Sequence, residues 1–222
     1  MTAAEESPES KRARAEAMAP ILAEAYPELE ITLDWSNPLE LIVATILSAQ
    51  CTDERVRKVT AELFPRYRTA EDYAGADREE LEKLVRPTGF FRNKAKHIQG
   101  MARKVVEEHG GEVPDTMEGL VELPGVARKT ANVVLTNAFG KVSGVVVDTH
   151  VRRVSRRMGF ATSKTASAIE KELMEVLPEE QWHPFAWRLI LHGREVCHGR
   201  KDPECDRCPV AEHCPSAFTF GD

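Results

Sequence analysis

The 222-residue sequence is most informative at one short stretch, Leu123-Pro124-Gly125-Val126-Ala127-Arg128-Lys129-Thr130. The residues before it, 116–123, can form a short helix, and apolar positions from Ala131 to Ala138 have helical spacing. Pro124-Gly125 is typical of a tight turn. The stretch predicts a helical hairpin that presents backbone N–H groups at a helix N-terminus, where phosphate binds without regard to base sequence. A plain helix–turn–helix connection has the same pattern.

Two ionisable residues near this hairpin are candidates for chemistry. Lys129 lies in the first turn of the second helix, where the macrodipole disfavours a cation. A lysine that has lost its proton is a nucleophile able to form a Schiff base at a sugar C1′. A phosphate-binding lysine beside Arg128 is the alternative. Asp148 is an isolated acid at the end of an apolar run, and it can be a helix cap, a catalytic group or both.

The remaining periodic segments predict an all-α fold. Apolar stripes at helical spacing occur in residues 39–50, 56–64, 81–85, 98–106 and 169–177. The only strand-like run, Val145-Val146-Val147, is too short to build a sheet. The mixed Glu, Ser, Lys and Arg composition of residues 1–14 has no apolar centre, so these residues are not a secretory signal. We expect residues 1–16 to be a flexible N-terminal extension.

The charges are segregated along a chain whose formal net charge is −6. Residues 86–104 carry six Lys or Arg and no acid, and residues 125–157 carry seven with only Asp148 acidic. Residues 192–201 add three basic residues against Glu195. If these basic windows converge in space, they form a phosphate-binding face despite the acidic total. Three ordinary solvated faces are the alternative.

Four of the five cysteines lie near the C-terminal end, with the spacing C-x7-C-x2-C-x5-C. Clustered thiols in a reducing compartment usually bind metal rather than form disulfides. One compact loop with four thiols suits a [4Fe–4S] cluster, which needs one thiolate at each corner, and zinc is the alternative. The ligands would be Cys197, Cys205, Cys208 and Cys214. The fifth, Cys51, is interpreted as a small buried apolar residue.

Taken together, the sequence LPGVARKTANVVL, the motif VDTHV and the four-Cys loop resemble the endonuclease III family of DNA glycosylases. The resemblance runs from about Ala17 to Cys214 and includes residues 47–50 and 190–194. It implies two helical domains with a DNA cleft between them. One is a six-helix barrel domain with the helix-hairpin-helix, here residues 31–141. The other is a discontinuous iron–sulfur domain of residues 17–30 plus 142–222.

The resemblance also implies a function and a set of site residues. The activity would be that of a bifunctional glycosylase and AP lyase that removes oxidised pyrimidines and cuts 3′ to the abasic site. Lys129 matches the nucleophile and Asp148 the catalytic carboxylate. The implied DNA contacts are Gln50, which fills the gap left by a flipped nucleotide, the wedge residue Phe90, the hairpin residues Gly125, Ala127 and Arg128, and the loop residues Arg200 and Lys201.

Several positions depart from the family pattern. Ala127 stands where Gly is usual, Phe90 where Leu is usual, and Cys51 where Ala is usual. The first cysteine spacing and the separation of Lys129 from Asp148 are each one residue longer than is common. Cys51 and Phe90 together leave the lesion range and the opposite-base preference open.

Two other functions remain to be distinguished. An adenine mismatch glycosylase usually lacks the lysine and carries a further C-terminal domain, whereas Lys129 is present and this sequence ends eight residues after Cys214. A weakly active DNA-binding iron–sulfur paralogue would have the same sequence pattern. We expect a monomer that binds double-stranded DNA containing damaged bases or abasic sites, without a membrane partner, in the cytoplasm with the nucleoid.

Overall fold

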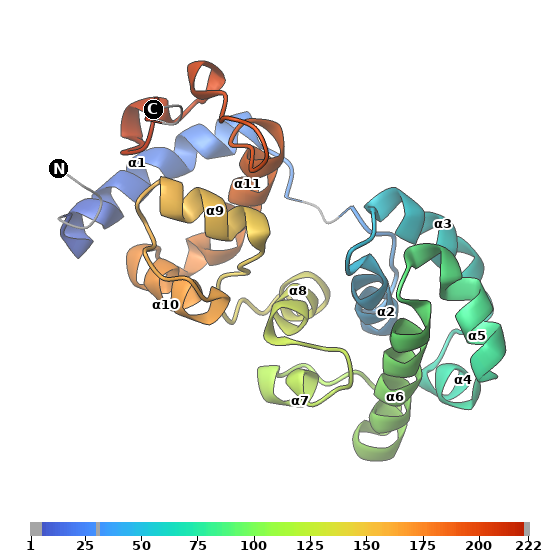
Figure 1. Ribbon diagram of the computed structural model, residues 1–222. Coiled ribbons are helices and arrows are strands. Elements are labelled where there is room, and N and C mark those ends of the chain that lie inside the picture. The colour runs from blue at the N-terminus through green and yellow to red at the C-terminus, as the bar shows by residue number, and fades with distance from the viewer. Residues whose placement is uncertain (1–5, 30–31, 220–222) are drawn as a thin grey trace. The chain divides into compact units, whose positions relative to one another are not determined.

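Helices make up all of the regular structure in the part of the chain that the computed structural model describes, residues 6–29 and 32–219 (Figure 1). This confirms the all-α fold class. None of the described helices is long and apolar enough to cross a membrane. The helices are α1 (Pro8–Ala25), α2 (Pro38–Ser48), α3 (Asp53–Leu63), α4 (Ala70–Gly75), α5 (Arg78–Val85), η1 (Arg86–Thr88), α6 (Phe91–His109), α7 (Met117–Val121), α8 (Arg128–Phe139), α9 (Thr149–Arg157), α10 (Ala166–Val176), α11 (Glu179–Glu195), η2 (Cys205–Arg207) and η3 (Ala211–His213).

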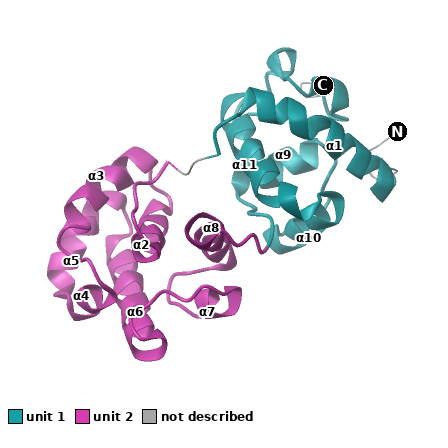
Figure 2. Cartoon of the chain, turned by 180° about the vertical axis from the view of Figure 1, so that it is seen from behind, with its two compact units in different colours: residues 1–30, 144–222 teal, residues 31–143 magenta. Residues whose placement is uncertain are grey.

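The chain divides into two compact units (Figure 2). Unit 1 comprises residues 1–30 and 144–222, and unit 2 comprises residues 31–143. The second boundary therefore falls two residues beyond the expected position 141. Local contacts explain the difference, because Ser143 Oγ donates to Asn132 Oδ1 of α8 at 2.7 Å and Lys141 pairs with Asp115. Residues 141–143 are thus bound to unit 2.

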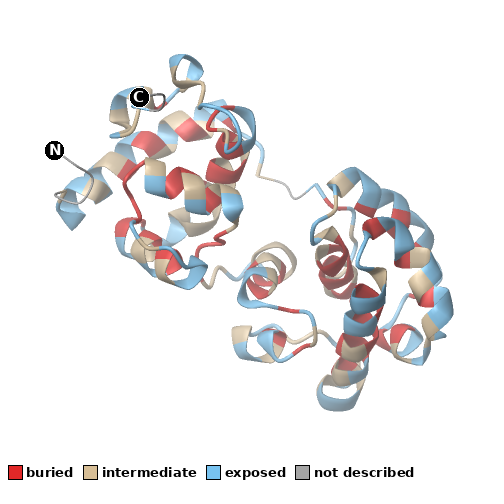
Figure 3. Cartoon of the chain, in the orientation of Figure 1, coloured by how far each residue is buried: buried red, intermediate tan, exposed pale blue. Residues whose placement is uncertain are grey.

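Unit 2 is organised around α2, which is apolar on nearly all sides. Leu41, Ile42, Val43 and Leu47 are completely buried, and Figure 3 shows α2 and the inner face of α6 coloured as buried. Asn37 caps α2 by accepting from the Glu40 N–H, with Pro38 at the first helical position. Helix α6 packs against α2, α4 and α5, so one long helix joins most of the unit.

Unit 1 combines α1 with α9, α10 and α11 around a second core. Met18 and Leu22 of α1 and Phe185 of α11 are completely buried there. Phe160, in the turn after α9, meets Phe185 edge to face at a ring separation of 5.8 Å. The segment after α11, which carries four cysteines, adds Cys197 and Val210 to this core.

The expectation of a flexible extension through residue 16 is wrong for residues 8–16, which belong to α1. Ser7 caps this helix and Pro8 begins it. Arg14 then fixes the helix to its unit: it pairs with Glu6 at 2.6 Å, donates to the Met158 carbonyl at 2.6 Å, and lies over the Phe160 ring. Residues 1–5 of the expected extension lie outside the described residues.

Candidate functional site

The predicted hairpin is formed by α7, the turn at Pro124-Gly125 and α8. Gly125 has a φ of +83°, a conformation that favours glycine. Ala127 is the N-cap of α8 and has ordinary extended backbone, with φ −87° and ψ 167°. An alanine in place of the usual glycine is therefore unstrained. Because its methyl group cannot accept a hydrogen bond, Ala127 leaves the first-turn N–H groups of α8 without a side-chain cap.

The turn is packed closely onto α6. A Cβ atom at Gly125 would lie 2.7 Å from His97 Cβ, and one at Gly100 would lie 3.4 Å from Pro124 Cγ. The hairpin therefore needs glycine at position 125 both for its backbone conformation and for this contact. Lys129, the second residue of α8, has an exposed side chain. The turn and α6 thus hold a solvent-facing lysine on a fixed support.

Two further predicted DNA contacts, Gln50 and Phe90, lie at the tips of separate loops in unit 2. Gln50 follows α2 and has a φ of 53°, and Phe90 precedes α6 and has a φ of 46°. Both side chains are exposed, and Phe90 is one of the few exposed large apolar residues, at 66%. A non-glycine residue in the left-handed region is uncommon, and strained backbone of this kind clusters at functional sites.

A buried lysine, Lys94, joins these two loops. Its Nζ donates to the Leu47 carbonyl at 2.8 Å, three residues before Gln50, and to the Thr88 carbonyl at 2.7 Å, two residues before Phe90. The residue is only 4% exposed, and burial lowers its pKa. Sequence analysis missed this residue because it counted Lys94 among the surface charges of the 86–104 window. Backbone carbonyl partners leave no signal in a sequence.

Asp148 is the N-cap of α9 in unit 1, which confirms the sequence prediction that it caps a helix. Its Oδ1 accepts from the backbone N–H groups of His150 and Val151, at 2.7 and 2.8 Å. In the described part of the chain, Oδ2 has no hydrogen-bond partner. One oxygen therefore fixes the carboxylate on the helix while the other can interact with a ligand. Lys129 belongs to unit 2 and Asp148 to unit 1, so each is placed here within its own unit.

The four C-terminal cysteines are all free thiols, and they line one cavity of unit 1. Cys197 is buried and the other three are partly buried. Within residues 6–29 and 32–219, no three side chains of His, Cys, Asp or Glu are arranged to hold a single metal ion. A [4Fe–4S] cluster has a different requirement, one thiolate at each of four corners. Four unpaired thiols around one cavity fit that requirement.

Polar groups behind the cysteines fix this cavity to the core. Arg157 Nη1 lies 3.3 Å from Cys197 Sγ and donates to the His198 carbonyl at 2.6 Å. The buried His192 lies with its Nε2 3.7 Å from Cys208 Sγ, and its Nδ1 shares a hydrogen bond with the Tyr26 hydroxyl at 3.0 Å. Burial raises the pKa of Cys208 to about 11 and lowers that of His192 to about 4. Helices α1 and α11 thereby both support the cysteine loop.

The two predicted phosphate contacts of the cysteine loop, Arg200 and Lys201, differ in their ion pairing. Arg200 and Lys201 are both exposed. Lys201 Nζ, however, pairs with Glu204 Oε1 at 2.7 Å, and Glu204 also accepts from His198 and pairs with Arg207. Hydrogen bonds from Lys201, His198 and Arg207 lower the pKa of Glu204 to about 2. Much of the expected positive charge at Lys201 is thus balanced within the loop itself.

Matches to known proteins cover parts of both units. Residues 43–179 match the HhH-GPD superfamily of base excision DNA repair proteins. Endonuclease III of Synechocystis sp. is 55% identical over 208 residues, covering 94% of each chain. Endonuclease III of Bacillus subtilis is 46% identical, covering 87% of this chain and 88% of that protein.

A solved structure resembles the whole fold. The structure of a trapped endonuclease III–DNA covalent intermediate matches with a TM-score of 0.87 and 41% identity, covering 94% of this chain and 97% of that one. The match extends over nearly the full length of both chains. This chain therefore belongs to the endonuclease III family within the HhH-GPD superfamily of base excision DNA repair proteins.

Proposed function

We propose that this chain is a bifunctional DNA glycosylase and AP lyase of base excision repair that acts on oxidised pyrimidines in duplex DNA. The observation that carries the proposal is Lys129, an exposed amine held in the first turn of α8 directly after the uncapped hairpin. Phosphate bound by the first-turn N–H groups would place the DNA backbone beside this amine. Family membership supports the same activity.

The reaction needs a neutral amine and a carbanion-stabilising imine. Lys129 Nζ attacks C1′ of the lesion, the N-glycosidic bond breaks, and the base leaves with a proton. The sugar ring opens as the C1′ imine forms. The imine acidifies the C2′ proton, and its loss forms a C2′=C3′ bond and expels the 3′ phosphate. Water then hydrolyses the imine and regenerates Lys129.

Asp148 supplies the negative charge that this sequence needs. Its Oδ1 is committed to the cap of α9, so the carboxylate is held in place before the substrate binds. The second oxygen would stabilise the positive charge that develops on the sugar as the base departs, which is the role of a preorganised electrostatic group. The same oxygen would accept the proton that the nitrogen loses once it has attacked C1′.

Gln50 and Phe90 would support the base flipping that exposes C1′. A flipped nucleotide leaves a gap in the duplex. The Gln50 side chain, exposed at its loop tip, would fill this gap, and the exposed Phe90 ring would insert beside it as a wedge. Both loops carry left-handed residues and are joined by Lys94. Their preorganisation would reduce the conformational entropy lost on binding.

The four free thiols would hold a [4Fe–4S] cluster, through Cys197, Cys205, Cys208 and Cys214. When bound, the cluster supplies a cross-link between four residues of the segment that follows α11. Its role would be structural, because it would fix the conformation of the loop that carries Arg200 and the partly balanced Lys201. Both residues would contact phosphate.

Trapping with borohydride tests this function. Duplex DNA with one oxidised pyrimidine should yield a stable protein–DNA adduct, because reduction of the imine links Lys129 to C1′. Lys129→Ala should give no adduct and still bind DNA, whereas Lys96→Ala, which removes an exposed lysine of α6, should leave the adduct unchanged. An undiminished adduct from Lys129→Ala would overturn the assignment. Base release only from an adenine mispair would instead identify the mismatch enzyme.

A further inference from the structure

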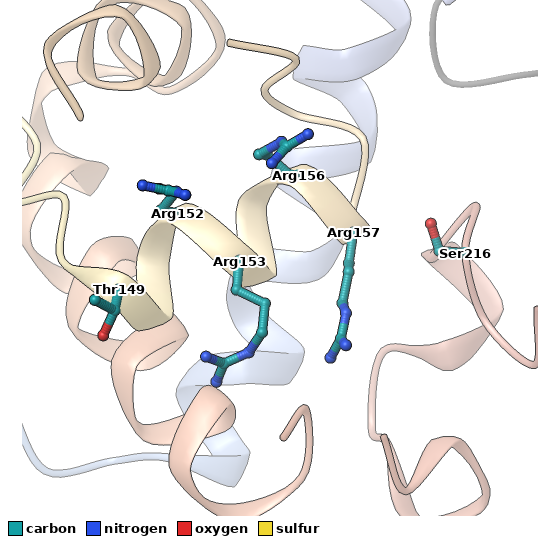
Figure 4. A pocket seen from close by; sticks show the side chains of 6 residues that line it. All are labelled: Thr149, Arg152, Arg153, Arg156, Arg157 and Ser216. Atoms are coloured by element: carbon teal, nitrogen blue, oxygen red, sulfur yellow. The ribbon is translucent and has the colours of Figure 1, made fainter. Parts of the chain in front are cut away.

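A hollow of about 540 Å³ lies along α9 in unit 1, next to the start of the helix at Thr149. Four of the six lining residues are arginines, and none is acidic. Figure 4 shows the lining residues, which all belong to α9 except Ser216 from the segment that follows Cys214. The hollow thus extends from the residue after Asp148 to the C-terminal cysteine loop.

The four arginines form two rows with different roles. Arg153 donates to the Cys197 carbonyl at 3.1 Å and to the Gly193 carbonyl at 2.7 Å, and Arg157 contacts Cys197 Sγ and the His198 carbonyl. Figure 4 shows these two side chains directed to the opposite side of α9 from Arg152 and Arg156. The four-residue spacing within each row puts its two members on one face of the helix. One row therefore holds the cysteine loop.

The other row, Arg152 and Arg156, is exposed, and neither side chain has a hydrogen-bond or ion-pair partner among the described residues. Two like charges four residues apart repel each other on a helix. Only Arg156 lies in the last turn, where the macrodipole favours a cation. The macrodipole therefore stabilises only one of the two charges, and a bound anion would remove the repulsion between them.

We infer that Arg152 and Arg156 bind the phosphodiester backbone of the DNA strand that carries the lesion, as a track leading away from Asp148. The inference rests on the proposed function. If Asp148 acts on the sugar of the lesion, the phosphates next to that sugar must lie near the first turns of α9. Arg152 follows Asp148 by four residues and Arg156 by eight, so they lie about 6 and 12 Å along the helix axis.

The chemistry of the lining favours a polyanion over a small ligand. A site for a specific metabolite usually combines apolar contacts with a few directed polar groups. This hollow is lined by charge and two hydroxyl residues, Thr149 and Ser216, with no aromatic or large apolar side chain. Guanidinium groups bind phosphate through two parallel N–H donors. Arg152 and Arg156 would therefore contact backbone phosphates and would not distinguish one base from another.

Salt dependence of DNA binding tests the inference. The affinity for a duplex with a non-cleavable abasic analogue is measured over a range of salt concentrations. Each phosphate contact adds about −0.9 to the slope of log K against log salt. Arg152→Gln/Arg156→Gln should therefore reduce the magnitude of the slope by about 1 to 2. The control, Lys164→Gln/Lys171→Gln, removes two exposed charges from the same unit and should leave the slope nearly unchanged.

Further measurements separate the possible outcomes. Arg152→Lys/Arg156→Lys keeps both charges and should restore most of the slope. If the Gln double variant does not fold, the two single variants are measured, each with an expected change of about 0.9. An unchanged slope, or equal changes in the arginine and control pairs, would overturn the track. Borohydride trapping by the unaltered protein is recorded in parallel: without an adduct the proposed function fails, whereas an adduct with an unchanged slope refutes only the track.

Discussion

Replacement of Lys94 by Met should uncouple the two loops that carry the predicted DNA contacts Gln50 and Phe90, without changing either of these residues. Met matches the length of the lysine stem but has no N–H donor. The substitution leaves the Leu47 and Thr88 carbonyls without the two short hydrogen bonds that Lys94 Nζ provides. Both carbonyls lie within three residues of a left-handed loop residue, Gln50 or Phe90.

The loss of stability expected for Lys94→Met follows from the two hydrogen bonds that Lys94 makes. A hydrogen bond to a charged group stabilises by about 1.5–3 kcal/mol, so two contribute about 3–6 kcal/mol. Removal of a buried charge returns part of its desolvation cost, which leaves a net loss of about 2–4 kcal/mol. For a protein of this size, the melting temperature should fall by about 5–15 °C. Greater freedom of one loop residue costs about 1–2 kcal/mol on binding, which is about a tenfold loss of affinity.

A matched variant separates stability from positioning. Met101→Ala removes a completely buried side chain from the same helix, α6, and should cost a similar 2–5 kcal/mol. Thermal melts of both variants are compared with their affinity for an abasic-analogue duplex at 25 °C. Lys94→Met should lose stability and affinity, whereas Met101→Ala should lose stability alone. Equal affinity in the two variants, or an unchanged melting temperature for Lys94→Met, would refute the reasoning.

Three other substitutions have clear expected outcomes. Asp148→Asn keeps an oxygen that can accept from the cap N–H groups, so its melting temperature should change little, while single-turnover strand cleavage should slow by about 10²-fold or more; an unchanged rate would remove Asp148 from the mechanism. Gly125→Ala places a methyl group against His97 in a backbone conformation that costs about 1–2 kcal/mol, so thermal melts should show that loss and DNA affinity should fall; full affinity would show that the turn geometry is unimportant. Cys205→Ser should reduce the iron content per chain and the DNA affinity, and Cys51→Ser should change neither; equal iron in both would contradict the proposed ligand set.

Local signals in the sequence were sufficient for the hairpin and for the cap of α9. Pro124-Gly125 specifies a turn through the backbone of two adjacent residues, and a carboxylate directly before a helix specifies a cap. Both features depend on residues within one or two turns of each other. The structure bears this out at Gly125, with its positive φ, and at Asp148, whose Oδ1 accepts two N–H groups.

Contacts between distant segments account for what the sequence did not predict. Arg14 belongs to a charged segment that resembles a solvated terminus. Its main partners, the Met158 carbonyl and the Phe160 ring, lie more than 140 residues away. Lys94 was counted as surface charge for the same reason, since its partners are backbone carbonyls of two remote turns. A sequence shows which side chains are charged. It does not show which of them are buried and hydrogen-bonded to backbone carbonyls.

The same contacts determine how many side chains of the basic windows are available to bind phosphate. In the window 125–157, Lys141 pairs with Asp115, and Arg153 and Arg157 donate to the carbonyls of Cys197 and His198 in the cysteine loop. Fewer than the seven basic side chains of this window are therefore available to a ligand, and two that are available, Arg152 and Arg156, lie on one face of α9. Because phosphate binding depends on such local rows and not on net charge, an acidic protein with a total of −6 can still bind DNA.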